Sequence, residues 1–241
     1  MIEYDCVPVG EQTILIHFEE KIDITENLII HKLTKIISNK IPYITAVTPA
    51  YCSIMINFDV FKITFREIVE QLKTVINNFD FSQEDARAKI IEVPVCYNRE
   101  FAIDIEEIAS FAHMSIANLI ELHSKVNYFI YMLGFMPYYP YLGTTPDRIG
   151  MPRLESPRAK VPAGSVALAG KQAGIYPVES PGGWRIIGRT PIELYNPRNP
   201  RTRYEAGDYL HFYPISKTDF YRIKDLDIKG GFKMNEHMES I

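Results

Sequence analysis

Glycine and proline gather in one stretch of this chain of 241 residues. Residues 134–191 hold nine of the thirteen glycines, and with Pro197 and Pro200 this region holds eleven of the sixteen prolines. Glycine permits backbone angles closed to other residues and proline fixes its own, so such a stretch specifies particular turns between short strands. Aromatic residues such as Tyr176 and Trp184 bury enough apolar area to order these loops. We therefore expect functional loops here and not a flexible linker.

Short strands separated by turns fill the second half of the chain. The apolar runs predict strands at residues 128–133, 166–169, 175–178, 184–187 and 209–214. Such a series is the pattern of a closed barrel, whose binding loops cluster at the rim. A strand at 89–95 and two short helices, near 104–111 and 115–123, come before it, and Asp104 and Ser115 are natural N-caps.

Strand and helix patterns alternate in the first part of the chain. We expect strands at 13–18 and 53–58, a helix near 24–38, and a second helix from Thr64, which forms a capping box with Glu67. Together with the strand that follows, this order resembles a small ferredoxin-like split βαβ sandwich.

These patterns predict an α+β protein with three parts. Residues 1–85 form a small N-terminal α/β domain, and residues 86–215 form the barrel domain. Residues 216–241 are polar, contain Gly230 and Gly231, and are expected to form an appended C-terminal arm.

The sequence argues against several classes of protein. No apolar run approaches the roughly 20 residues of a membrane helix, and the N-terminus has no signal-peptide pattern, so we expect a soluble cytoplasmic protein. Cys6, Cys52 and Cys96 occur in no C-x-x-C spacing, and the histidines show no metal-ligand spacing, so we expect no disulfide framework and no metal site. Phosphate-loop and nucleophile-elbow motifs are also missing.

The net charge of -4 hides an asymmetry along the chain. Residues 147–203 carry ten Lys or Arg against four acids, so this segment has a charge of +6 and the rest of the chain -10. An excess of this size around Gly-rich turns suits a small anionic ligand or an acidic partner better than duplex nucleic acid. The alternative is that these are ordinary solvated charges.

Two arginines are the first candidates for an anion site. Arg153 and Arg158 each follow a proline, and a guanidinium group on a restricted backbone suits forked contacts with carboxylate or phosphate. Their separation of five places them on opposite faces of an extended strand, so they hold one ligand only if the intervening residues turn. Otherwise they are surface arginines on a loop.

Further candidates come from the same loops and from one helix. Gln172 and Tyr176 offer an amide and a hydroxyl to a lactam or carboxylate, or they belong to turn and barrel-rim packing. Trp184 ends a turn, and its indole is expected to line a pocket, to contact a partner or to fill the inside of the barrel. His123 lies on the apolar side of its expected helix, near the C-terminus, as a catalytic group or as a core or capping histidine.

Two segments resemble the signature of a known family. GFMPYYPYLG at 134–143 and PRLESPRAKVPAGSVALAGKQAGIYPVESPGGWRIIGRTP at 152–191 are similar to the family that contains the B subunit of the prokaryotic ATP-dependent 5-oxoprolinase. This family is also described as allophanate hydrolase subunit 1 and as a sporulation histidine-kinase inhibitor. The resemblance extends through IEVPVCY, DIEEIA and LIELH to most of the chain. It implies a cyclophilin-like barrel behind a small α/β domain.

The resemblance implies a protein that acts with two partners, the 5-oxoprolinase A and C subunits, to open 5-oxo-L-proline to L-glutamate with ATP. Phosphorylation of the unreactive lactam oxygen would turn it into a leaving group, and donors must stabilise the accumulating negative charge. Which of the three proteins binds ATP stays open. On this interpretation the catalytic candidates are Arg153, Arg158 and His123. The substrate-binding candidates are Gln172, Tyr176, Gly182, Gly183, Trp184 and Arg189.

The chain departs from the family at two places. Tyr138-Tyr139 stands where Gly-Phe is usual, and Phe-Ala-Ile replaces a Gly-containing turn at 101–103. A tyrosine disfavours positive φ, so the loop after Gly134 is expected to differ in shape. Two other functions stay open: a binding protein that inhibits a sensor histidine kinase through Tyr138, Tyr139 and Trp184, and a component of an allophanate or urea-amide hydrolase.

Overall fold

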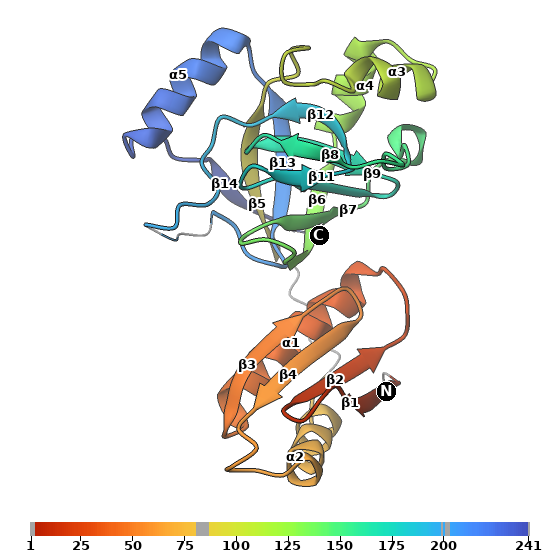
Figure 1. Ribbon diagram of the computed structural model, residues 1–241, viewed down its shortest axis with the longest axis vertical. Coiled ribbons are helices and arrows are strands. Elements are labelled where there is room, and N and C mark those ends of the chain that lie inside the picture. Colours follow the sequence, from red (N-terminus) through yellow and green to blue (C-terminus); the bar gives the residue numbers. More distant parts are fainter. Residues whose placement is uncertain (1–2, 81–86, 199, 201–202, 241) are drawn as a thin grey trace. The chain divides into compact units, whose positions relative to one another are not determined.

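The computed structural model describes residues 3–80, 87–198, 200 and 203–240. The chain divides into two compact units, Met1–Ala86 (unit 1) and Arg87–Ile241 (unit 2) (Figure 1). The described parts of both units contain no helix with the length and apolar character needed to cross a membrane. The whole is a mixed α+β protein, as the sequence predicts.

Unit 1 is an antiparallel sheet with two helices. The sheet order is β1-β2-β4-β3. Alternation along β2 buries Ile14, Ile16 and Phe18 in a core shared with the helices. The predicted capping box of α2 is present, because Thr64 and Glu67 exchange hydrogen bonds. The elements are β1 (Tyr4–Pro8), β2 (Thr13–Phe18), α1 (Ile24–Lys40), β3 (Ile44–Pro49), β4 (Ser53–Phe58) and α2 (Phe65–Asn77).

Two edge strands of unit 1 are additions to the sequence prediction. The edge beside β2 is occupied by β1, which pairs with β2 as a hairpin, and the other edge is occupied by β3. The expected final strand, β5, belongs to the sheet of unit 2. The ferredoxin-like assignment therefore stays a prediction, since β1 precedes the β2–α1–β3 segment instead of following α2.

Unit 2 is built on a curled half-barrel sheet (Figure 1). Its strand order is β12-β9-β10-β7-β6-β13-β5-β14, and a separate ribbon pairs β8 with β11. The strands are β5 (Arg87–Val95), β6 (Asn127–Leu133), β7 (Pro140–Gly143), β8 (Arg158–Val161), β9 (Ser165–Ala169), β10 (Gln172–Ile175), β11 (Ser180–Gly182), β12 (Arg185–Arg189), β13 (Tyr209–Pro214) and β14 (Glu236–Ser240). The helices are α3 (Ile105–Phe111), α4 (Ile116–Ser124), η1 (Asp147–Ile149) and α5 (Lys217–Ile228).

A single bridge joins β12 to the end of β5. The N–H of Cys96 donates to the carbonyl of Arg189 at 2.9 Å, and the N–H of Arg189 donates back at 3.0 Å. This bridge completes the curl on one side of the sheet. The expected strand at 175–178 lies earlier, as β10, because Pro177 follows the strand and cannot donate to a ladder.

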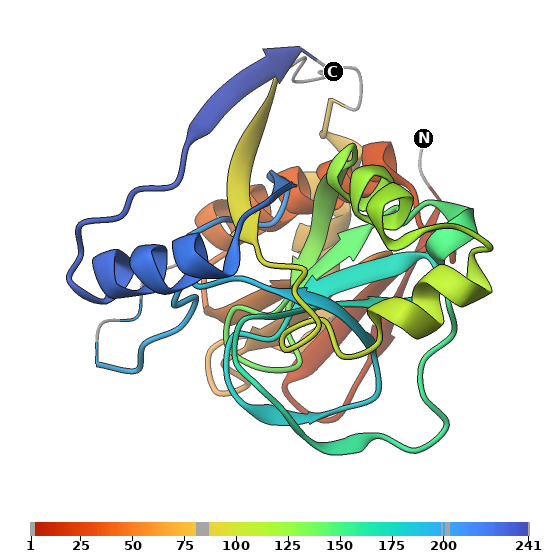
Figure 2. The same ribbon diagram turned by 90° about the horizontal axis from the view of Figure 1, so that it is seen from above.

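Residues 216–241, expected to form an arm, contain a helix and a strand. Ser216 caps α5 by accepting from the N–H of Asp219 at 3.0 Å. Phe220 and Ile223 are the buried apolar side chains of the helix. Downstream, β14 pairs antiparallel with β5, so this segment extends the sheet of unit 2 (Figure 2). The sequence of this segment does not predict β14, because every residue of the strand is exposed and the segment is polar.

Alternation along the strands gives the sheet of unit 2 two apolar faces. Val166, Leu168 and Ile187 lie in the main core, the large buried cluster that also contains Val93, Tyr128, Leu210 and Phe212. Their neighbours Ala167 and Ile186 lie on the other face, in a second cluster. The ribbon contributes Val161 to this second cluster. The second face carries the candidate site.

Candidate functional site

Aromatic side chains dominate the second face. Tyr139 and Tyr176 are buried, whereas Tyr141 and Trp184 are half-buried. The ring of Tyr139 makes edge contacts with Tyr176 at 5.3 Å and with Trp184 at 5.8 Å between centroids. We call these four residues the outer aromatic cluster. The half-exposed rings of Tyr141 and Trp184 form the part of this cluster on which a flat, weakly polar molecule can lie.

The hydroxyl of Tyr176 is fixed inside the outer aromatic cluster. It is hydrogen-bonded to the backbone of Trp184 and to Tyr139, while burial, the larger effect, raises its pKa. A side chain at Gly182 would clash with this hydroxyl, so the predicted pocket residue Gly182 is needed for a close approach. Tyr176 is therefore a neutral, well-oriented group rather than an ionised one.

Arg158 lies beside the cluster and is already paired. Its Nη2 donates to Oδ1 of Asp104 at 2.6 Å, and its Nη1 donates to the carbonyl of Trp184 at 3.4 Å. The Asp104 side chain is 5% exposed and that of Arg158 is 26% exposed. The second oxygen, Oδ2, accepts the N–H of Ile186 at 2.6 Å. One buried carboxylate thus fixes the arginine to the sheet.

Arg153 is the exposed arginine of the predicted pair. Its neighbours are tied to the turn before β12, since the N–H of Leu154 donates to the carbonyl of Gly183 at 2.7 Å. Nε of Arg185 donates to the carbonyl of Pro152 at 3.1 Å. These contacts bring the Arg153 segment next to Gly183. In the ribbon, Gly182 pairs with Arg158, so the structure gathers Arg153, Arg158, Tyr176, Gly182, Gly183 and Trp184.

Two other predicted residues have different positions. Arg189 donates from Nε to the carbonyl of Ala163 at 2.7 Å, and its guanidinium carbon lies 6.0 Å from the centre of the Phe101 ring. Burial lowers the pKa of Arg189. Because its backbone also forms the bridge to Cys96, Arg189 supports the closure of the sheet. Gln172 is half-buried at the start of β10, opposite Ala169 of β9.

His123 lies in the main-core region of unit 2 and has no exposed surface. Its Nδ1 is 2.8 Å from the hydroxyl of Tyr97, and its ring stacks on Phe212 at 5.0 Å between centroids. Burial lowers its pKa to about 3, so the imidazole is neutral near pH 7. Within the described residues, Nε2 of His123 and the hydroxyl of Tyr128 have no partner. These contacts favour a core histidine, one of the two interpretations left open by the sequence.

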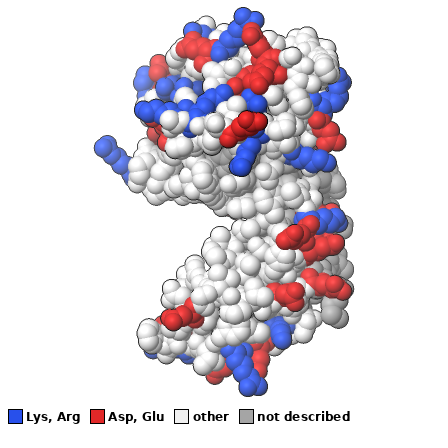
Figure 3. Space-filling model, turned by 45° about the vertical axis from the view of Figure 1, so that its right-hand side comes forward, with Lys and Arg blue, Asp and Glu red and all other residues white. Residues whose placement is uncertain are grey.

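Three arginines of the positive segment at 147–203 pair with acids from outside this segment. Besides Arg158 with Asp104, Arg185 pairs with Glu107 at 2.7 Å, and Arg203 pairs with Asp227 at 2.7 Å. In unit 2, the upper part of Figure 3, basic and acidic side chains accordingly lie next to one another. The sequence count of +6 therefore overstates the field at the candidate site.

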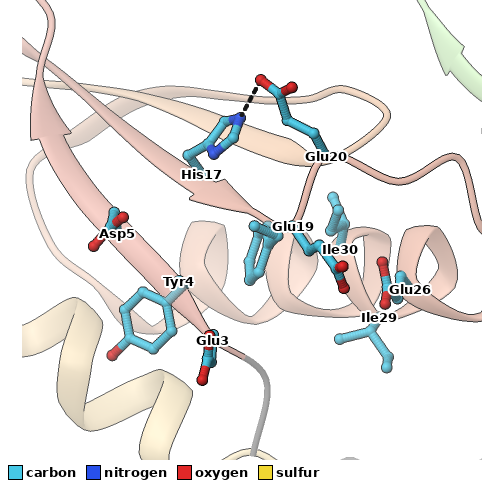
Figure 4. A pocket seen from close by; sticks show the side chains of 10 residues that line it. Glu3, Tyr4, Asp5, His17, Glu19, Glu20, Glu26, Ile29 and Ile30 are labelled. Atoms are coloured by element: carbon cyan, nitrogen blue, oxygen red, sulfur yellow. Dashed lines mark ion pairs between the residues drawn. The ribbon is translucent and has the colours of Figure 1, made fainter.

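A pocket on unit 1 has the opposite character. Its wall includes five acidic residues, and His17 lies 3.8 Å from Glu20 (Figure 4). Carboxylates in this number repel an anionic ligand, so this pocket does not suit the predicted substrate. The five acids are Glu3, Asp5, Glu19, Glu20 and Glu26. Among the residues that the structure describes, no group of three His, Cys, Asp or Glu side chains is placed to hold a metal ion.

Asp104 is the residue whose role the sequence does not reveal. The sequence predicts that it caps the helix that follows, and it does stand at the N-cap of α3, but its side chain makes no capping hydrogen bond. The carboxylate binds Arg158 instead, 54 positions along the chain. A local pattern cannot reveal such a distant partner. Sequence reasoning also misses Tyr139 and Tyr141 as cluster members, although their position in the Gly- and Pro-rich stretch is a signal.

The sequence of the chain is similar to those of known enzymes. Residues 4–204 match the family described as "Carboxyltransferase domain, subdomain C and D". The chain is 34% identical over 240 residues to the 5-oxoprolinase B subunit of Bacillus subtilis. This alignment covers 93% of this chain and 98% of that protein. It is also 26% identical over 150 residues to a "Putative urea carboxylase" of Emericella nidulans, covering 58% of this chain and 12% of that protein.

Solved structures agree with this relationship. The protein TTHA0988 is 30% identical with a TM-score of 0.74, over 85% of this chain and 40% of that one, so the chain spans about two fifths of its length. The urea carboxylase of Kluyveromyces lactis, 18% identical with a TM-score of 0.81 over 100% of this chain and 24% of that one, shares the fold. The chain therefore belongs to the carboxyltransferase-domain family, subdomain C and D, together with the B subunits of bacterial 5-oxoprolinases.

Proposed function

We propose that this chain is the B subunit of an ATP-dependent 5-oxoprolinase, which opens 5-oxo-L-proline to L-glutamate together with the A and C subunits. The observation that carries the proposal is the match to the 5-oxoprolinase B subunit of Bacillus subtilis, which extends over 98% of that protein. A match of this extent favours the same role in the same kind of assembly. We place the complex in the cytoplasm, where ATP is available.

The chemistry requires an activated lactam. Transfer of the γ-phosphoryl group of ATP to the lactam oxygen releases ADP. Water then adds to the activated carbon and the ring C–N bond breaks, which leaves the new carboxyl group as an acyl phosphate. A second water hydrolyses this acyl phosphate and releases phosphate. The net reaction uses ATP and two waters and yields glutamate, ADP and phosphate. Donors that meet the developing negative charge lower the barrier.

The candidate site offers groups that fit such a substrate. The outer aromatic cluster provides flat apolar edges for a five-membered ring, and Arg153 and Arg158 provide donors for its anionic groups. Arg153 is exposed, so it can reach an anion or a partner protein. We keep Gln172, Arg189 and His123 as candidates of lower rank, because Arg189 and His123 already have internal contacts.

The test measures glutamate release from 5-oxo-L-proline with ATP. We expect activity when this chain is mixed with its candidate A and C subunits, and none from the chain alone. Arg153→Ala should lower the activity of the mixture at least about tenfold while the thermal midpoint stays within about 2 °C, because this side chain is exposed. Lys160→Ala, an exposed ribbon residue paired with Glu179, serves as the control that should leave activity unchanged. A purified, verified assembly without activity would overturn the proposal.

A urea-derived amide is the second candidate substrate. The 26% identity to a putative urea carboxylase favours it, but over a smaller part of the chain. The same mixture incubated with allophanate separates the two, because hydrolysis of allophanate releases ammonia and no glutamate, whereas 5-oxo-L-proline yields glutamate. The inhibition of a histidine kinase stays a prediction. The finer fold assignments, cyclophilin-like for unit 2 and ferredoxin-like for unit 1, belong to this proposal, and the curled half-barrel sheet supports the first.

A further inference from the structure

A buried carboxylate sets the direction of the Arg158 guanidinium group. Asp104 cannot turn freely, because Oδ2 accepts the N–H of Ile186 at 2.6 Å and the N–H of Asp104 donates to the carbonyl of Ile186 at 3.1 Å. Its Oδ1 binds Nη2 of Arg158 at 2.6 Å. The backbone of β12 therefore determines where the carboxylate lies, and the carboxylate determines where the arginine points.

Arg158 keeps further donors after these contacts. A guanidinium group has five N–H donors, and the described contacts use Nη2 toward Asp104 and, at the long distance of 3.4 Å, Nη1 toward Trp184. The side chain is 26% exposed and lies beside the half-buried Trp184. The remaining donors can thus meet a ligand that rests on the outer aromatic cluster.

The pairing decides which anionic group suits Arg158. Together with Asp104 it has no net charge, so it offers directed hydrogen bonds rather than a strong field. Directed, forked donors match a planar carboxylate whose charge is present throughout the reaction. Charge that develops on the lactam oxygen is better met by an unpaired cation, and Arg153 is exposed and available for that role.

We propose that Asp104 is a positioning residue that turns Arg158 toward the carboxylate of a cyclic amide substrate, so that this pair selects carboxylated lactams. The inference rests on the proposed function and deepens it. It predicts discrimination between 5-oxo-L-proline and its primary amide, 5-oxo-L-prolinamide, in which an uncharged group replaces the carboxylate.

The experiment compares both compounds with the assembled complex, following ADP release. Asp104→Asn keeps the size of the side chain and an acceptor for Ile186 but removes the charge that holds Arg158. We expect KM for 5-oxo-L-proline to rise about 10- to 100-fold, with kcat and the turnover of the amide changed less than about twofold. Glu107→Gln is the matched control, since Glu107 lies in α3, the helix that Asp104 precedes, and pairs with Arg185 of β12. The Glu107 side chain is 53% exposed, so its replacement should leave the preference intact.

A second comparison keeps the inference testable if Asp104→Asn alone does not assemble. Arg158→Gln and the double variant Asp104→Asn/Arg158→Gln should show the same loss of preference, because a positioning residue has no effect without the group it positions. A larger loss in the double variant would overturn the inference. So would an active wild-type complex whose Asp104→Asn form keeps its preference. A wild-type complex that converts neither compound would overturn the proposed function, and the inference with it.

Discussion

The buried histidine of unit 2 makes stability depend on pH in a calculable way. His123 has no exposed surface, and burial lowers its pKa to about 3, against about 6.5 in the unfolded chain. Between these two pKa values the His123 imidazole is protonated in the unfolded chain and neutral in the folded chain. Stability contributed by the neutral imidazole is therefore present above pH 6.5 and is lost as the pH falls.

The size of the loss follows from the two pKa values. Each pH unit well inside this window costs about 1.4 kcal/mol for one proton, and between pH 7 and pH 5 the integrated loss is about 2 kcal/mol. For a unit of this size, about 2 kcal/mol lowers the thermal midpoint by roughly 4 to 8 °C. Carboxylates add their own pH dependence, which a comparison with a variant removes.

The assay is urea unfolding at pH 7 and pH 5 of the wild-type protein and of His123→Phe. The variant keeps a ring against Phe212 but cannot be protonated, so it should lose about 2 kcal/mol less than the wild type over this interval. Phe212→Leu is the control, because it disturbs the same stack and keeps the imidazole; it should follow the wild type. Equal losses for wild type and His123→Phe would refute the reasoning.

Three further substitutions test local features. Arg158→Ala should lower the free energy of unfolding by about 2 to 4 kcal/mol, because it leaves the Asp104 carboxylate buried without its cation; a change within about 0.5 kcal/mol would contradict the pairing. Gly182→Ala should cost about 1 to 3 kcal/mol through a clash with the Tyr176 hydroxyl, and Tyr176→Phe in the same chain should recover part of the loss in a thermal melt. Tyr138 has a φ of 60°, so Tyr138→Gly should be more stable than Tyr138→Ala by about 1 kcal/mol in chemical unfolding, and the reverse order would speak against this backbone angle.

The elements that could be predicted are those with a buried side. The sequence predicts a strand at 209–214, and β13 occupies those residues because Tyr209, Leu210 and Phe212 are buried. Edge strands lack this signal. In β1 no residue is fully buried and only Tyr4 and Cys6 are half-buried, so its alternation is weak; β14 is exposed throughout and shows none. Their pairing partners, not their own side chains, make them strands.

The residues of the candidate site also fall into two groups, those whose position a local sequence pattern predicts and those whose position depends on distant partners. Helical spacing alone places His123 on the buried side of its helix, and it is buried. The exposure and charge of an arginine depend instead on partners that no local pattern reveals. Arg153 and Arg158 look alike in sequence, each after a proline, yet Arg158 pairs with a buried acid and Arg153 is exposed. The resembled family usually has glycine at position 138. Tyr138 adopts a φ of 60°, a backbone angle that glycine favours, so the two residues share a backbone conformation at this position.

The parallel pairing of β5 with β13 has a consequence for synthesis of the chain. Ile90 pairs with Tyr209, which leaves the ribosome 119 residues later. Until then β5, with its buried residues Ile91, Val93 and Val95, has no neighbour from β13 or β14. Such an unpaired apolar strand is prone to aggregation during translation, and the long loop makes its closure slow. Expression yield should therefore respond to temperature and chaperone supply more strongly than the stability of the finished fold suggests.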